Sequence, residues 1–335
     1  MKKIIKFSKS YGNILNIKKN FYNNNDSNLK NSLKINNIYK KQPVRKYCKN
    51  CGKKNITSFI KNFMIEYKLC LDCNHLNGKY QDTEIFANKL YNSSGGKNYY
   101  KNYLEDYDLR VKNIYGPKVD FLKKVIKEKI KLIDLGCGGG HFVKALEIKK
   151  INATGYDTSK KLCELGSKKL KKNQIFHTKF NNMCEIIEKS KDANTVSMIG
   201  VLEHLVEPNL ILDAFKKSKI KYLYISVPLF SLSTFIENSF TNIFPRQLSG
   251  GHTHLYTEKS LKFLTNKYNL KVIGEYWFGT DIPDLFRSLV CSGNILNEKV
   301  YLKELNHKFS RFVDELQSVL DKNKVCSEVH LIFKK

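Results

Sequence analysis

The chain of 335 residues lacks any apolar run close to the ~18–20 residues that a membrane-spanning helix needs. It also lacks a secretory signal, because Met1–Phe7 has only a short apolar stretch between lysines. These two absences predict a cytoplasmic protein. The same start is basic, but it is rich in lysine and asparagine rather than arginine and serine. A mitochondrial transit peptide therefore stays as the alternative.

Acidic residues are few: 31 stand against 59 lysines and arginines, which leaves a formal net charge of +28. Residues 1–47 alone hold twelve cationic side chains and one acid, Asp26. Such a charge attracts phosphate groups, so nucleic acid, anionic lipid and nucleotide-linked substrates are candidate partners. Abundant lysine, asparagine and isoleucine are also what an AT-rich genome encodes, and that explanation requires no anionic partner.

The nine cysteines do not follow the pattern of a secreted disulfide protein, which indicates a reducing compartment. Four of them form two Cys-x-x-Cys pairs with 18 residues between the pairs. Pairs at this spacing bring four thiolates to one tetrahedral Zn²⁺. Four cysteine ligands leave no open coordination position, so we predict a structural ion. A module of ~35 residues depends on such an ion to fold. The predicted ligands are Cys48, Cys51, Cys70 and Cys73.

Composition divides the chain into four predicted parts. Residues 1–43 are polar and without periodicity, which predicts a loosely attached basic, Asn/Lys-rich tail. Residues 44–80 hold the cysteine pairs and predict a small zinc-ribbon-like module, and residues 81–128 predict a helical linker. In residues 129–335 strand and helix patterns alternate, which predicts βαβ units around a parallel sheet. The expected strands are 130–135, 151–156, 174–177, 194–199, 221–227, 270–278 and 328–333, with an irregular substrate segment at 229–256.

A glycine-rich turn follows the first of these strands. Residues 132–140 read Leu-Ile-Asp-Leu-Gly-Cys-Gly-Gly-Gly and lead into a predicted helix. Glycine lets a ligand approach the backbone closely, so Gly136, Gly138 and Gly140 are predicted to bind a nucleotide-type ligand. Their spacing is not the dinucleotide pattern G-x-G-x-x-G.

Two acids define the ligand of this turn more closely. Asp134 ends the strand ahead of the glycines, where a carboxylate repels a pyrophosphate and suits a cationic amino group. Asp157 ends the next strand and is placed to bind two ribose hydroxyls. S-adenosylmethionine carries a cationic amino group and a ribose and has no phosphate. We therefore predict that it is the cofactor.

These residues resemble those of class I S-adenosylmethionine-dependent methyltransferases. Besides the two segments above, Gly200–Pro208 and Ile225–Pro228 match the ends of the family's fourth and fifth strands. The resemblance implies an α/β, Rossmann-like fold with a mostly parallel seven-stranded sheet in the order 3-2-1-4-5-7-6. Strand seven is antiparallel in that order, and the last expected strand, 328–333, fits its position.

A second resemblance concerns one large subgroup of that family. Gly251–Thr257, followed by Ser260 and Leu261, is similar to its His-x-x-x-Phe/Tyr-Ser/Thr segment. Many members of the subgroup also carry a Cys-x-x-Cys-Gly…Cys-x-x-Cys ribbon ahead of the methyltransferase domain, and they often methylate nucleotide-linked sugars or surface glycans. The resemblance implies a small-molecule or glycan substrate: a sugar, a nucleotide-linked sugar or another small hydroxyl or carbon acceptor.

Candidate catalytic residues follow the fourth and fifth strands, at the sheet edge where ligands bind in open α/β sheets. Glu203 and His204 follow the fourth strand, and His252 and His254 lie in the substrate segment. Methyl transfer needs a base only when the acceptor is a hydroxyl or a carbon acid. We predict His254 or His252 as that base. The alternative is that these histidines position the substrate or cap a loop.

Three other functions stay open. An RNA or DNA methyltransferase would suit the basic charge and the ribbon, but strand four ends neither in Asn/Asp-Pro-Pro-Tyr nor in Pro-Cys, as base methylases require. A ubiquinone-type O-methyltransferase is disfavoured by Gly200 and by the ribbon. A non-catalytic S-adenosylmethionine-binding protein is disfavoured by the intact Asp134 and Asp157.

Overall fold

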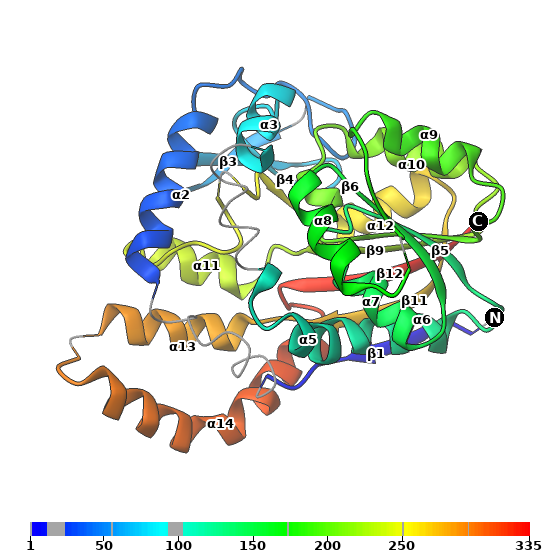
Figure 1. Ribbon diagram of the computed structural model, residues 1–335. Helices are drawn as coiled ribbons and strands as arrows, with labels where there is room; N and C mark the ends of the chain where they lie inside the picture. Colours follow the sequence, from blue (N-terminus) through cyan, green and yellow to red (C-terminus); the bar gives the residue numbers. More distant parts are fainter. Residues whose placement is uncertain are drawn as a thin grey trace.

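The computed structural model describes residues 2–11, 24–54, 56–92, 103–172, 174–249, 251–293 and 295–335. They form a large and a small β-sheet with helices around them (Figure 1). The strands of the large sheet are β1 (Ile4–Phe7), β5 (Lys131–Leu135), β6 (Asn152–Asp157), β7 (Ile175–His177), β8 (Thr195–Ile199), β9 (Tyr222–Pro228), β11 (Lys271–Phe278) and β12 (Glu328–Lys334). Those of the small sheet are β2 (Ile56–Asn62), β3 (Ile65–Cys70), β4 (Leu76–Gly78) and β10 (His254–Leu255).

The helices lie around both sheets. They are α2 (Asn25–Tyr39), α3 (Glu84–Asn92), α5 (Tyr107–Arg110), α6 (Gly116–Val125), α7 (His141–Ile148), α8 (Lys160–Lys169), α9 (Asn182–Lys189), α10 (Pro208–Lys217), α11 (Leu232–Ser239), α12 (Glu258–Lys267), α13 (Asp281–Ser292) and α14 (Glu298–Lys322). A π-helical turn (Val111–Tyr115) joins α5 to α6, and a 3₁₀ turn (Leu202–His204) follows β8. Within the described residues, none of these helices has both the length and the apolar character that crossing a membrane requires.

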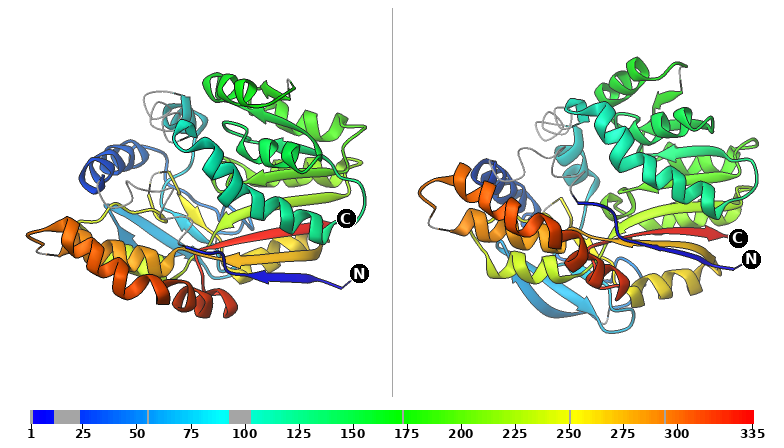
Figure 2. Two further views of the ribbon diagram at one scale, coloured as in Figure 1. Left: turned by 60° about the horizontal axis from the view of Figure 1, so that its bottom comes forward. Right: turned by 90° about the horizontal axis from the view of Figure 1, so that it is seen from below.

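The large sheet has the order β1-β11-β12-β9-β8-β5-β6-β7. The strands from β5 to β9 pair in parallel, and β12 is antiparallel to both β9 and β11. Numbered from β5, seven of these strands follow 3-2-1-4-5-7-6. The prediction of a seven-stranded sheet is nevertheless wrong, because β1 adds an eighth strand beside β11 (Figure 2).

The added strand differs from the prediction of a loosely attached tail at 1–43, of which residues 12–23 lie outside the described residues. Ile4–Phe7 pairs in parallel with Gly274–Trp277, and Lys3 Nζ lies 2.7 Å from Glu275 Oε1. Without β1, β11 would be the sheet edge and would present unpaired backbone groups. Further along the same segment, α2 packs its buried Tyr39 against the small sheet. A four-residue strand and a polar helix lack the long periodicity that sequence reading depends on.

Both faces of the large sheet are buried, as a parallel sheet requires. Along β9, Leu223 and Ile225 pack in the hydrophobic cluster shared with α9, α10 and α12. Tyr222 and Tyr224, which alternate with them, face the cluster formed with α6 and α7. Because α5, the π-helical turn and α6 belong to this layer, residues 107–125 are part of the sheet's covering and not the linker that was predicted for 81–128.

The small sheet joins the cysteine-bearing segment to the rest of the chain. Its first three strands come from residues 56–78, but the fourth, β10, comes from the predicted substrate segment. Leu255 pairs with Leu76, and His254 pairs with Asn77. The predicted module at 44–80 therefore completes its sheet with a strand from the end of residues 229–256. That segment also contains a helix, α11, where an irregular chain was expected.

Candidate functional site

The glycine turn after β5 has a backbone that only glycine adopts without strain. Gly136, Gly138 and Gly140 all have positive φ angles, of 69°, 54° and 73°. A Cβ atom on Gly136 would lie 2.6 Å from a methyl carbon of Val201, and one on Gly138 would lie 2.6 Å from the ring of Tyr103. The turn therefore passes close to two side chains that face it, and no larger residue fits at either position.

The amides of the turn are used within the fold. The N–H groups of Gly136 and Cys137 donate to the Tyr156 carbonyl at 2.8 and 3.1 Å. Gly138 N–H donates to Asp157 Oδ2 at 2.8 Å. A phosphate-binding loop points such amides at its ligand instead. This turn consequently suits a ligand that presents a sugar and a base rather than a phosphate at this point.

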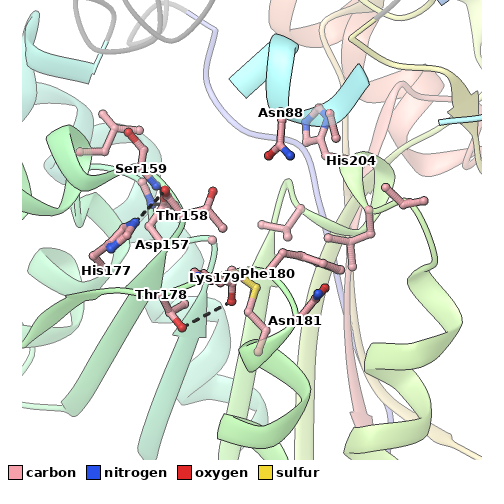
Figure 3. A pocket seen from close by; sticks show the side chains of 18 of the residues that line it. Asn88, Asp157, Thr158, Ser159, His177, Thr178, Lys179, Phe180, Asn181 and His204 are labelled. Atoms are coloured by element: carbon pink, nitrogen blue, oxygen red, sulfur yellow. Dashed lines mark hydrogen bonds between the residues drawn. The ribbon is translucent and has the colours of Figure 1, made fainter. Parts of the chain in front are cut away.

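A pocket of about 540 Å³ lies over the turn, at the carboxyl ends of β5, β6 and β8. This volume is within the ~300–1,000 Å³ that small-molecule sites occupy. Gly136, Gly138 and Asp157 line it, as predicted from the sequence. Figure 3 shows Asp157 on one side of the hollow, with Asn88 of α3 and His204 on the other.

Asp157 is held in place by the backbone and keeps acceptor capacity for a ligand. Its two carboxylate oxygens accept from Gly138 N–H and Ser159 N–H, each at 2.8 Å. Burial raises its pKa from the ordinary value, although these two hydrogen bonds act in the opposite direction. A carboxylate has about four acceptor positions, so about two are left for hydroxyl groups. The residue thus fits the predicted role of binding a ribose.

Asp134 and Gly140 do not line the pocket. Asp134 is 2% exposed, and Ser197 Oγ donates to its Oδ1 at 2.6 Å, which ties β5 to β8. Burial raises its pKa to about 7. A Cβ on Gly140 would press on Ile175 and Gly166, so this glycine allows helix packing. In this fold both residues support the turn from behind, and their direct contact with the cofactor stays a prediction.

A cluster of three titratable side chains lies at the His204 end of the pocket. Glu203 and His204 come from the 3₁₀ turn after β8, and His252 comes from the segment before β10. Their donor atoms lie within 4.8 Å of one another, with His204 Nε2 3.9 Å from Glu203 Oε1. Two histidines and a carboxylate at this distance can exchange protons, and they also offer donor atoms of the kind that divalent metals bind.

The buried position of this cluster shifts its proton affinities in opposite directions. Burial raises the pKa of Glu203 to about 8 and lowers those of His204 and His252 to about 3 and about 4. Near neutral pH both imidazoles are therefore uncharged. Glu203 Oε2 and His252 Nδ1 are buried and have no hydrogen-bond partner among the described residues. His204 Nδ1 donates to the Gly251 carbonyl at 3.1 Å, which places the ring's lone pair on Nε2.

His254, one of the two bases predicted from the sequence, lies elsewhere. It is fully buried and does not line the pocket, and its Nδ1 lies 2.9 Å from His75 Nε2. Burial lowers its pKa well below the ordinary value. A base must reach the acceptor within hydrogen-bond distance. Of the two predicted bases, the structure brings His252 to the cluster and turns His254 toward the cysteine-bearing segment.

Residues 107–275, just over half of the chain, match a protein family described as a methyltransferase domain. The chain belongs to this family. It is an S-adenosylmethionine-dependent methyltransferase with a Rossmann-like sheet. The glycine turn and Asp157 lie at the carboxyl ends of β5 and β6 in that sheet. No curated protein matches the sequence.

Solved methyltransferase structures resemble this methyltransferase at low sequence identity. Magnesium protoporphyrin IX methyltransferase from Synechocystis PCC 6803, with bound SAH, is 12% identical with a TM-score of 0.49, over 76% of this chain and 100% of that one. A SAM-dependent methyltransferase from Archaeoglobus fulgidus is 18% identical with a TM-score of 0.42, over 76% and 100%. A putative sarcosine dimethylglycine methyltransferase from Galdieria sulphuraria is 11% identical with a TM-score of 0.41, over 66% and 84%.

The second candidate site of the methyltransferase is the predicted group of four cysteines. All four Sγ atoms lie within 4.8 Å of one another, with Cys48–Cys73 at 3.6 Å and Cys51–Cys70 at 3.5 Å. Zn–S bonds of ~2.3 Å in a tetrahedron give sulfur–sulfur distances of about 3.8 Å. The side-chain amide of Asn77 points at Cys48 Sγ from 3.5 Å, as groups around bound thiolates do. The residues present therefore fit a zinc ion.

Sequence reasoning missed several residues that line the pocket of the methyltransferase. Thr158 directly follows Asp157, so the end of β6 was a signal that could have included it. Tyr103 and Asn88 come from the region predicted as a linker, and nothing in their spacing relates them to the glycine turn. His75 is not among the predicted site residues, yet it is fully buried against His254.

Proposed function

We propose that this methyltransferase transfers a methyl group from S-adenosylmethionine to a hydroxyl or carbon acid of a small acceptor, such as a sugar or a nucleotide-linked sugar. One observation carries the proposal. The pocket over the glycine turn ends at His204, and there Glu203, His204 and His252 gather as a cluster of three acid–base side chains. A base at this place serves acceptors that must lose a proton.

The cofactor side of the proposal rests on three groups. Asp157 holds the ribose through its remaining acceptor positions, and Gly136 and Gly138 give the ligand a close approach to the backbone. When bound, S-adenosylmethionine supplies an electrophilic methyl group on a sulfonium. The protein's contribution is then to align the acceptor with that methyl, which is chiefly an effect of proximity.

On the acceptor side, His204 lines the pocket, and Glu203 beside it is the proposed proton acceptor, while the histidines orient the acceptor. With its pKa raised to about 8, Glu203 is ionised in part at mildly alkaline pH, and the ionised carboxylate can take a proton. His204 and His252 are neutral and can each take or give one hydrogen bond to an acceptor hydroxyl. In this proposal Glu203 takes the proton from the acceptor. The acceptor's oxygen or carbon forms a bond to the methyl, and the methyl–sulfur bond breaks.

We also propose that Cys48, Cys51, Cys70 and Cys73 hold a structural Zn²⁺. The four sulfurs close a tetrahedron, so the ion would have no open position for substrate. Its role would be to stabilise the turn between β3 and β4 and to fix it to the Cys48–Cys51 turn that precedes β2.

Binding measurements followed by an acceptor screen test the proposal. Calorimetry should show that the purified protein binds S-adenosylmethionine and S-adenosylhomocysteine. If it binds neither, the proposed enzymatic function is refuted. Protein supplied with methyl-labelled S-adenosylmethionine would then be offered a panel of nucleotide-sugars and, separately, RNA. We expect label in the small-molecule fraction. Label in RNA alone would replace the proposed substrate class with the nucleic-acid one that the basic charge suggests.

A further inference from the structure

The segment Gly251–Thr257, which carries His252, is held from two sides. On the pocket side, His204 Nδ1 donates to the Gly251 carbonyl at 3.1 Å. On the opposite side, Gly78 N–H of β4 donates to the Thr253 carbonyl at 2.6 Å, and β10 pairs with β4. The position of His252 therefore depends on the small sheet as well as on the methyltransferase sheet.

A buried pair of imidazoles joins the segment to the cysteine turn. His75 Nε2 and His254 Nδ1 lie 2.9 Å apart, across 179 residues of sequence, and both side chains are fully buried. The other nitrogen of each ring has no hydrogen-bond partner among the described residues. Each ring thus makes its one side-chain hydrogen bond to the other. If either ring is lost, the remaining one is left buried and unsatisfied, which is unfavourable.

His75 is in turn fixed by the cysteine turn. Its backbone carbonyl accepts the N–H of Cys70 at 2.9 Å, and Asn74 N–H donates to the Cys70 carbonyl at 2.8 Å. The Asn74 carbonyl accepts Thr257 Oγ1 at 2.9 Å, at the other end of the acceptor-side segment. A change in the Cys70–Cys73 turn consequently moves both ends of the contact with Gly251–Thr257.

We propose that His75 is a positioning residue through which the metal-bound cysteine turn holds His254, and with it the segment that places His252 at the acceptor site. The proposal rests on the proposed function in one respect, that His252 faces the acceptor. Metal occupancy would then govern acceptor binding. It would leave the cofactor pocket unchanged, because the glycine turn and Asp157 have no contact with the small sheet in the described hydrogen bonds.

Hydrogen–deuterium exchange of the zinc-loaded full chain with S-adenosylhomocysteine tests this coupling. The variants are His75→Leu, which keeps volume without the hydrogen bond, and His75→Gln, whose side-chain amide can still reach His254. His307→Leu, an exposed histidine on α14, is the matched control. In His75→Leu we expect amides of Gly251–Thr257 to exchange about tenfold faster, with the affinity for S-adenosylhomocysteine within about twofold of wild type. His75→Gln should restore much of the protection.

The outcomes separate the proposal from its alternatives. Unchanged exchange at Gly251–Thr257 in His75→Leu overturns it, and so does an equal loss of protection throughout β2 and β3, which a merely structural role predicts. If His75→Leu does not fold, wild-type protein stripped of zinc by a chelator must show the same local loss, and unaltered exchange there overturns the coupling. If wild-type protein fails to bind S-adenosylhomocysteine, the proposed function fails, while the exchange comparison still decides the coupling.

Discussion

The two ends of the pocket are built in different ways. The cofactor end is local in sequence: the glycine turn and Asp157 lie within the 24 residues from Asp134 to Asp157, on two paired strands. The acceptor end collects Glu203 and His204 from one turn, His252 from a segment 48 residues later, and His75 and His254 from segments 179 residues apart. The cofactor end is therefore a sequence motif, whereas the acceptor end is assembled only when the chain folds.

This difference has a physical consequence for how each end responds to damage. The cofactor end rests on a sheet that is buried on both faces, so its geometry follows from the main core. The acceptor end rests on the small sheet, whose core is much smaller and whose cysteine cluster contributes to its stability. Substitutions should therefore affect the two ends separately, and the predictions below are ways to separate them.

The largest effect should follow from removing a cysteine ligand. Cys70→Ser leaves three thiolates and should abolish stoichiometric zinc, since the remaining shell is open. Because metal binding in such modules is coupled to folding, we expect the melting temperature to fall on the order of 10 °C. Elemental analysis and thermal unfolding measure the two effects. Cys184→Ser, a half-buried cysteine on α9 outside the cluster, is the control. Wild-type protein without zinc would contradict the metal assignment itself.

The next effect concerns the acceptor end alone. Glu203→Gln keeps the shape of the side chain and removes its basicity, so turnover should fall by about 10²–10⁴. Affinity for S-adenosylhomocysteine should stay within about twofold, because Glu203 does not line the cofactor pocket. The measurement is methyl transfer to an acceptor identified in the screen, beside calorimetry. Glu207→Gln changes an exposed glutamate four residues away and should be silent. Equal turnover in both variants would remove Glu203 as the base.

The same contrast explains what could be predicted from the sequence. The strands of the large sheet from β5 onward and the glycine turn were predictable because their signals are local: apolar runs, alternation with helices, and an acid at a fixed distance. Expected and observed bounds differ by one or two residues, for example 130–135 against Lys131–Leu135. Asp157 lines the pocket, and its place could be predicted for the same reason, since it follows from its own strand.

The errors all concern tertiary contacts. β1 was missed because four residues carry no period, and its pairing with β11 spans about 270 positions. His254 was predicted to be a base because it shares a segment with His252, but His252 lies in the turn bridged to Ser249 before β10 and meets Glu203, whereas His254 lies in β10 and meets His75. Asp134 was assigned to the cofactor because it precedes the glycines, whereas its side chain turns into the sheet toward Ser197.

The position of Asp134 gives a prediction on pH. Burial raises its pKa from 3.8 to about 7, so the folded state favours the neutral carboxyl. Its contribution to stability is complete below about pH 4 and is lost as the pH rises through about 7, a difference of up to ~4 kcal/mol. Asp134→Asn has no such loss, so its unfolding free energy should fall less between pH 5 and pH 8. Urea unfolding at both pH values measures this, with the exposed Asp192→Asn as control. Parallel curves for wild type and Asp134→Asn would show that the carboxyl is not neutral in the fold.

The smallest expected effect, on cofactor affinity, compares the acid that lines the pocket with the acid that supports the turn from behind. Asp157 lines the pocket and Asp134 does not, although both are buried acids at the ends of adjacent strands. Asp157→Ala removes the acceptor of two hydroxyls, and hydrogen bonds to a charged group contribute about 1.5–3 kcal/mol each, so we expect the affinity for S-adenosylhomocysteine to fall by about 100-fold. Asp134→Asn should change it by less than about fivefold. Calorimetry of both variants decides the point. If Asp134→Asn weakened binding as much as Asp157→Ala, the carboxyl of Asp134 would have to reach the ligand, and the sequence-based assignment would replace the structural one.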